Sequence, residues 1–92
     1  MFNKINAEDV VDLQQAQKII QAYGSPVYVY NKGLMLAKLD YLISSLPPSF
    51  TLSFAMKANT NPHILQLLLK NGISHVDAVS PGEIVRALRC GF

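Results

Sequence analysis

The chain has 92 residues, of which 50% are hydrophobic and 15% are charged, and its formal net charge is +2. This length allows one small domain or part of a larger one, and the high apolar content excludes a disordered or highly solvated segment. The cations are scattered, so we expect neither a nucleic-acid surface nor a membrane-binding patch. One cysteine and two histidines without ligand spacing predict no disulfide and no metal site. The first nine residues lack the apolar segment of a signal peptide, and no apolar run approaches the length that a membrane span needs. We therefore expect a reduced, cytoplasmic chain.

Residues 1–31 predict a helix followed by a strand. Asn6 can cap a helix that has acidic residues in its first turn and ends near Tyr23 and Gly24. Residues 27–30, with the sequence VYVY, are β-branched and aromatic, which is typical of a strand. This strand needs a sheet to join.

The next segment predicts an amphipathic helix. Asn31 is its candidate N-cap, and the consecutive Pro47 and Pro48 stop it. Its apolar residues recur at helical spacing, so they should form one buried stripe. The stripe consists of Met35, Leu39, Leu42, Ile43 and Leu46.

Residues 49–72 predict a first strand and a helix after it. The strand covers residues 51–57, and its alternation sorts the side chains onto two faces. One face is apolar (Leu52, Phe54 and Met56), and the other carries small side chains with a lysine at the strand's carboxyl end (Thr51, Ser53, Ala55 and Lys57). Asn61 and Pro62 can open the helix, and Gly72 fits the position just beyond its end.

Residues 73–92 repeat this order. A strand covers residues 75–79, Ser80 and Pro81 open a helix, and Gly91 closes it. Ser80 and Glu83 also fit a capping box, in which the Glu83 carboxylate accepts from the Ser80 amide. Two strand–helix units in succession predict an α/β fold with a parallel sheet. Two strands cannot close a barrel, so we expect a fragment or a truncated product.

Lys57 is the strongest candidate for chemistry. An amine held at a crowded, partly dry strand end loses stability as an ammonium, so it becomes nucleophilic and could form a Schiff base. The competing interpretation is an ordinary lysine at the end of a strand. Asp77 ends the second strand at the same end of the sheet, where its carboxylate could cap a turn. We assign no catalytic role to His63, His75 or Cys90, and we expect Cys90 to be a small buried hydrophobe.

Two spaced motifs carry a family resemblance. They are FAMKAN at residues 54–59 and DAVSPGE at residues 77–83, and YGSPVYVY at residues 23–30 extends the similarity. Together they resemble the barrel-fold pyridoxal-phosphate decarboxylases of basic amino acids, among which the branch that acts on diaminopimelate is the most similar. The resemblance covers the chain from about Tyr23 to its last residue, roughly the first quarter of such an enzyme. Met56 and Pro81 are small departures from the usual motif.

The resemblance implies that residues 32–92 are the first units of a TIM-type (β/α)8 barrel of the alanine racemase-like fold, incomplete in this chain. It implies that residues 1–31 hold a helix and a strand that joins a carboxyl-terminal β domain. It also implies that Lys57 is catalytic and forms a Schiff base with pyridoxal 5′-phosphate, with Asp77 near the lysine and the cofactor. This reading requires Lys57 to present its amine into an enclosed chamber.

The activity implied is that of a carboxy-lyase in lysine biosynthesis, which converts meso-diaminopimelate to L-lysine and carbon dioxide in a cytoplasmic homodimer. Decarboxylases of arginine, ornithine or carboxynorspermidine are alternatives, because the residues that bind the substrate, the phosphate and the ring nitrogen would lie beyond Phe92. Further alternatives are a barrel-type racemase, a non-catalytic carrier of the same cofactor, and a module without enzymatic activity. We expect little or no turnover from the 92 residues alone.

Overall fold

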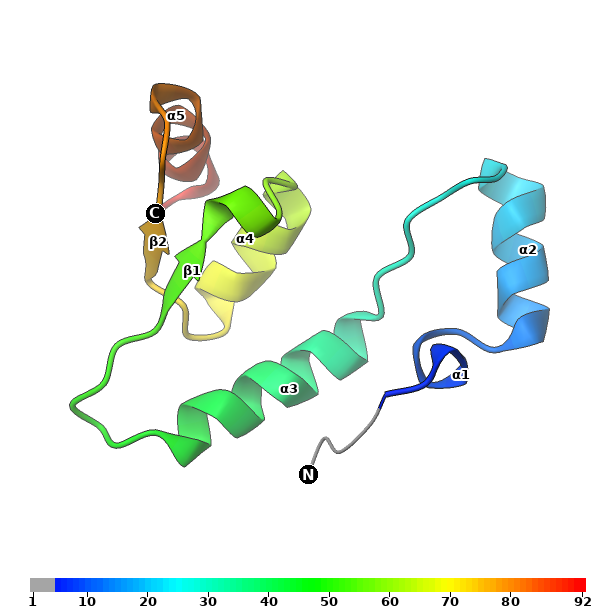
Figure 1. The fold of residues 1–92 in the computed structure, drawn as a ribbon, viewed down its shortest axis with the longest axis horizontal. Coiled ribbons are helices and arrows are strands. Elements are labelled where there is room, and N and C mark those ends of the chain that lie inside the picture. The colour runs from blue at the N-terminus through cyan, green and yellow to red at the C-terminus, as the bar shows by residue number, and fades with distance from the viewer. Residues whose placement is uncertain (1–4) are drawn as a thin grey trace. The chain divides into compact units, whose positions relative to one another are not determined.

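The computed structural model describes residues 5–92, and Figure 1 shows their helices and strands in chain order. The elements are α1 (Ala7–Val10), α2 (Leu13–Tyr23), α3 (Lys32–Ser45), β1 (Ser53–Ala55), the 3₁₀ helix η1 (Met56–Ala58), α4 (Pro62–Lys70), β2 (His75–Asp77) and α5 (Pro81–Cys90). The chain divides into two compact units, Met1–Tyr41 and Leu42–Phe92. No helix in residues 5–92 combines the length and the apolar character that a membrane span requires.

The first helix of the sequence prediction is broken into α1 and α2. Asp12 caps α2, because its Oδ1 accepts from the Gln15 amide at 2.8 Å while Gln15 Oε1 accepts from the Asp12 amide at 3.3 Å. A short acceptor side chain at this position offers the backbone an alternative to a continuous helix, which explains the break. The predicted end was correct, since α2 stops at Tyr23 and Gly24 follows with φ of 85°.

Residues 27–30 form no strand within the described part of the chain. The tyrosine at position 28 is 90% exposed, and the segment has no neighbouring strand with which to form a hydrogen-bonded ladder. Asn31 ends the segment and anchors it, because its Nδ2 donates to the Val10 carbonyl at 2.9 Å. Its Oδ1 accepts from the Leu34 amide at 2.9 Å, which confirms Asn31 as the cap of α3.

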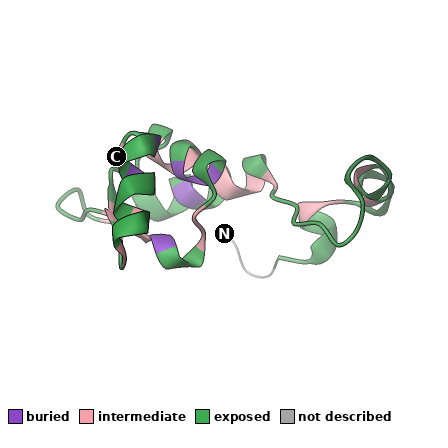
Figure 2. Cartoon of the chain, turned by 90° about the horizontal axis from the view of Figure 1, so that it is seen from above, coloured by how far each residue is buried: buried purple, intermediate pink, exposed green. Residues whose placement is uncertain are grey.

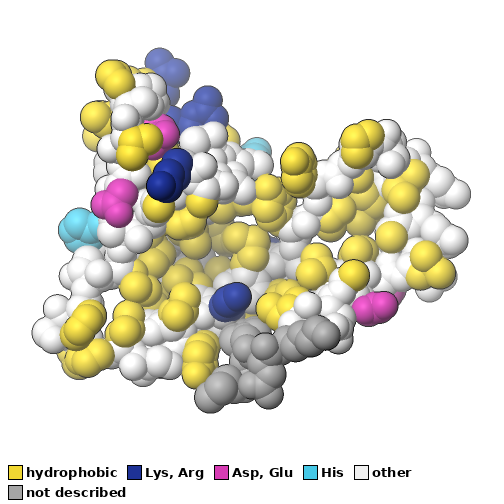
Figure 3. Space-filling view, in the orientation of Figure 1, with side chains coloured by type: hydrophobic (Ala, Val, Ile, Leu, Met, Phe, Trp, Pro, Cys, Tyr) yellow, Lys and Arg dark blue, Asp and Glu magenta, His cyan; other side chains and the backbone are white. Residues whose placement is uncertain are grey.

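Helix α3 ends before Pro47, as predicted, but its apolar stripe is only partly buried. Leu39 is buried, whereas Leu42 and Ile43 are 45% and 39% exposed, so the expected continuous stripe was wrong for these two residues. Large hydrophobic side chains are exposed elsewhere in the chain as well, and they appear in yellow in Figure 3.

The second unit contains a parallel sheet of two strands, which confirms the predicted α/β organisation. Three residue pairs set its register: Ser53 with His75, Phe54 with Val76, and Ala55 with Asp77. Both strands are shorter than predicted, since residues 51–57 and 75–79 were expected and only three residues of each pair. Figure 1 shows the strands side by side next to α4 and α5.

One face of this sheet packs on the helices. One buried cluster consists of Met56, Leu65, Ala87 and Cys90, and Phe54 and Val76 from the two strands pack against it. Buried residues are a small fraction of the described chain, and most of the other residues are exposed, as Figure 2 shows. The apolar alternation predicted for the first strand therefore selects the face that α4 and α5 cover.

The helix caps of the second unit match the sequence prediction with one correction. Asn61 Oδ1 accepts from the His63 amide at 2.9 Å, and Ser80 Oγ accepts from the Glu83 amide at 3.2 Å. The Glu83 carboxylate, however, accepts from the Val79 amide at 3.0 Å and not from the Ser80 amide. Val79 lies one residue farther from the helix than Ser80. The Glu83 carboxylate therefore satisfies the backbone amide of Val79, in the way that a capping box satisfies the amide of the N-cap residue.

Candidate functional site

The face of the sheet that points away from α4 and α5 is polar and accessible. We call it the open face, and it consists of Ser53, Ala55, His75 and Asp77. Paired residues of a parallel ladder project to the same side, so all four share this face while Phe54 and Val76 take the other. Its side chains other than Ala55 are exposed.

Lys57 lies at the carboxyl end of β1, as predicted, but within the 3₁₀ turn η1 and not within the strand. Met56 is fully buried beside it, and the Asn59 amide closes the turn by donating to the Met56 carbonyl at 3.1 Å. A buried anchor next to an accessible lysine fixes the backbone from which the amine projects. Sequence periodicity could not reveal this turn, because three residues of 3₁₀ helix carry no repeat.

The side chain of Lys57 is exposed, so the enclosed chamber expected around its amine is wrong for the described residues. Two strands supply one wall only, and a chamber requires side chains on several sides. Ser53 and Ala55, two of the small side chains that the sequence placed on one face with Lys57, lie in β1, whereas Lys57 itself follows the strand.

Asp77 lies at the same end of the sheet as Lys57. It pairs with Ala55, two positions before the lysine, because the carboxyl ends of the two parallel strands meet at one edge. Its Oδ1 accepts a hydrogen bond of 3.1 Å from Ser53 Oγ, which the sequence prediction did not include. The structure thus brings both predicted site residues to one end of the sheet.

The loop after Lys57 is held by side chains. Asn59 Oδ1 accepts from the Asn61 amide at 2.9 Å, which shapes the approach to α4. Arg86 in α5 donates from Nη1 to the Thr60 carbonyl at 3.1 Å, so the second strand–helix unit tethers the loop of the first. This tether was missed at the sequence level, since an arginine on a helix gives no sign of which distant carbonyl it will reach.

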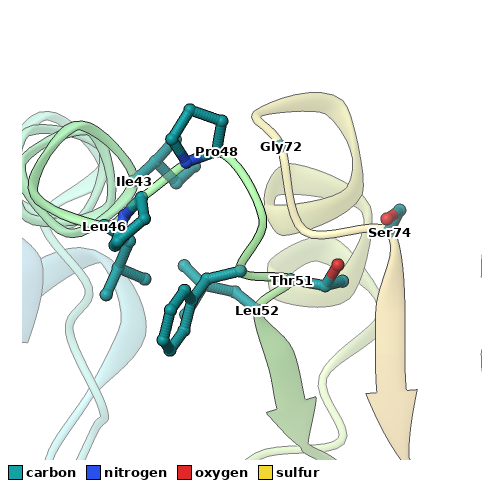
Figure 4. A pocket seen from close by; sticks show the side chains of 9 residues that line it. Ile43, Leu46, Pro48, Thr51, Leu52, Gly72 and Ser74 are labelled. Carbon is teal, nitrogen blue, oxygen red and sulfur yellow. The ribbon is translucent and has the colours of Figure 1, made fainter.

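A hollow of about 280 Å³ lies at the opposite, amino-terminal end of the strands. Figure 4 shows its lining, in which Thr51 and Leu52 precede β1 and Ser74 precedes β2. It contains neither Lys57 nor Asp77, and its lining carries no acidic or basic side chain. Because ligands of parallel α/β sheets bind at the carboxyl ends of the strands, we do not assign this hollow to the site.

The structure also places the three residues to which the sequence assigned no catalytic role. Cys90 is buried in the core, and its Sγ lies 4.0 Å from the Pro62 carbonyl oxygen. The His75 ring shares a contact of 2.9 Å between its Nδ1 and Ser74 Oγ, while His63 is exposed in the first turn of α4. No cluster of three metal-ligating side chains is found in residues 5–92.

Comparison with known proteins identifies the class to which this arrangement belongs. The family model for the pyridoxal binding domain of pyridoxal-dependent decarboxylases matches residues 33–92, which is more than half of the chain. The chain therefore belongs to the pyridoxal-dependent decarboxylase family, as its two motifs indicated. The cofactor that the motifs implied, pyridoxal phosphate, agrees with the description of this family.

Several individual relatives are diaminopimelate decarboxylases. That of Streptomyces coelicolor is 40% identical over 70 residues, which cover 76% of this chain and 15% of the relative. That of Methanothermobacter thermautotrophicus is 34% identical over 99 aligned residues, which cover 100% of this chain and 23% of the relative. That of Escherichia coli K12 is 40% identical over 70 residues, which cover 76% of this chain and 16% of the relative. The chain thus spans less than a quarter of the length of these relatives, and no solved structure matches it.

Proposed function

We propose that the protein carrying this chain is a pyridoxal-phosphate-dependent carboxy-lyase that converts meso-diaminopimelate to L-lysine and carbon dioxide. The observation that supports it most is the position of Lys57, at the carboxyl end of β1 and within the part of the chain that matches the pyridoxal binding domain. The substrate is inferred from the relatives, which are named diaminopimelate decarboxylases.

The residues present fit the cofactor. An aldehyde needs a reachable primary amine, and Lys57 offers an exposed side chain. When bound, pyridoxal phosphate supplies an electron sink for the electron pair left behind as carbon dioxide departs. Lys57 would hold the cofactor through Nζ, and the Asp77 carboxylate would orient that nitrogen and stabilise a proton on it.

We further propose that β1 and β2 are the first two strands of a (β/α)8 barrel whose interior is the open face. Residues 32–92 would form this part of the barrel, and residues 27–30 would gain a strand partner in a carboxyl-terminal β domain. Additional strands would complete the chamber around Lys57, because they would add the walls that two strands lack. The complete protein would act on a small amino acid as a cytoplasmic homodimer.

Two measurements on the full-length protein test this function. Carbon dioxide release is measured with meso-diaminopimelate, arginine, ornithine and carboxynorspermidine as substrates. Borohydride reduction in the presence of the cofactor, followed by peptide mapping, locates the amine that holds it. We expect release from meso-diaminopimelate and label at Lys57, both lost in Lys57→Ala and both kept in the matched Lys70→Ala at the end of α4.

The other outcomes decide among the alternatives. Release from another basic amino acid alone would reassign the substrate, and label at Lys57 without release would favour a racemase or a carrier. No label at Lys57 would refute the proposal.

A further inference from the structure

The open face carries one hydrogen bond that neither the sequence motifs nor the proposed reaction accounts for. Ser53 Oγ donates to Asp77 Oδ1 at 3.1 Å, although the two residues are 24 positions apart in the chain. Ser53 pairs with His75 and Asp77 pairs with Ala55, so the bond runs diagonally from one strand to the other. It joins a neutral hydroxyl to the predicted partner of Lys57.

We propose that Ser53 is a positioning residue that holds the Asp77 carboxylate in place for the Lys57 amine and the cofactor bound to it. This inference rests on the proposed function. A carboxylate can rotate about its side-chain bonds, and a hydroxyl that donates to Oδ1 restricts this rotation. A carboxylate has acceptor sites on both oxygens, so Oδ2 keeps the capacity to accept from the amine.

The position of the bond argues against a purely structural role. The core lies on the other side of the sheet, where Phe54 and Val76 pack, and neither Ser53 nor Asp77 is buried. An exposed hydrogen bond competes with water, so it adds little to the stability of the fold. The hydrogen bond instead restricts the orientation of the Asp77 carboxylate. Asp77 lies two residues further along the strand pair than Ser53, at the end of the sheet that carries Lys57.

The test uses the full-length protein loaded with pyridoxal phosphate and three variants. Ser53→Ala removes the donor, and Ser53→Thr keeps a hydroxyl on a residue that strands accommodate well. Ser74→Ala is the matched control, since it removes another exposed serine hydroxyl, one that contacts the His75 ring. The measurements are kcat and KM for carbon dioxide release, the visible absorption bands of the bound cofactor, and the borohydride label at Lys57.

We expect Ser53→Ala to lower kcat by about three- to tenfold with little change in KM, the range that the loss of one ordinary, solvent-exposed hydrogen bond supports. We also expect it to change the visible absorption bands of the bound cofactor, because the Asp77 carboxylate is then free to rotate away from the lysine nitrogen. Ser53→Thr should restore both properties, and Ser74→Ala should leave both unchanged.

Two results would overturn the inference in distinguishable ways. If the unmodified protein releases carbon dioxide and labels at Lys57, while Ser53→Ala behaves like Ser74→Ala in rate and absorption, the positioning role of Ser53 is wrong and the proposed function stands. If the unmodified protein neither labels at Lys57 nor releases carbon dioxide, both are wrong.

Discussion

Replacing Met56 by Ala tests the link between the core and the turn that contains Lys57. Met56 is 0% exposed, belongs to the cluster with Leu65 and Ala87, and precedes Lys57 directly. The change removes the thioether and its flanking carbons, which is about 2.5 kcal/mol of transfer free energy at about 0.8 kcal/mol per methylene-sized group. The cavity left behind adds to this loss, so we expect the free energy of unfolding to fall by about 3 to 4 kcal/mol.

The assay is denaturant unfolding of the full-length protein, followed by a signal from the domain that holds the cofactor. Met56→Leu is the matched control, because a volume-conserving exchange should cost less than about 1.5 kcal/mol. A second readout is the yield of borohydride label at Lys57 under native conditions, which Met56→Ala should lower because the turn loses its anchor. Equal stability of the Ala and Leu variants would refute the placement of Met56 in the core.

Four further outcomes follow from the described contacts. Asp77→Asn should lower kcat for carbon dioxide release by about 100-fold while the midpoint of denaturant unfolding stays unchanged. Equal kcat values for the variant and the unmodified protein would show that Asp77 does not belong to the site. Gly72→Ala should destabilise the fold by more than about 1 kcal/mol, because φ of Gly72 is 112° and the added Cβ would lie 2.7 Å from Ile43 Cδ1. An unchanged midpoint of denaturant unfolding would contradict this expected strain. Ser80→Ala should cost about 1 kcal/mol by removing the cap of α5, with Ser74→Ala as the control without a cap. The 92-residue chain assayed alone with cofactor should release little or no carbon dioxide, and substantial release would show that two strands suffice.

Local signals in the sequence predicted the caps of the second unit well. Asn61 and Ser80 accept the hydrogen bonds expected of them, and Gly91 adopts the left-handed conformation, because each preference depends on a few adjacent residues. The parallel pairing of the strands followed in the same way from the order of the elements.

The errors concern features that depend on more distant chain or on competing local bonds. Asp12 interrupts the expected first helix because its side chain caps a new one. Lys57 has no chamber because neighbouring strands, which the described residues do not include, would have to build it. The contacts of Ser53 with Asp77 and of Arg86 with the Thr60 carbonyl span more than twenty positions, so no periodic pattern could predict them.

The tether from Arg86 to the Thr60 carbonyl has a consequence for biosynthesis of the protein. Translation proceeds from the amino terminus, so Lys57 leaves the ribosome 29 residues before the arginine that steadies its loop, as the numbering of the chain shows. A nascent polypeptide therefore exposes the lysine on an untethered loop until α5 has emerged and folded. The loop that follows Lys57 therefore reaches its final geometry only at that later stage of synthesis.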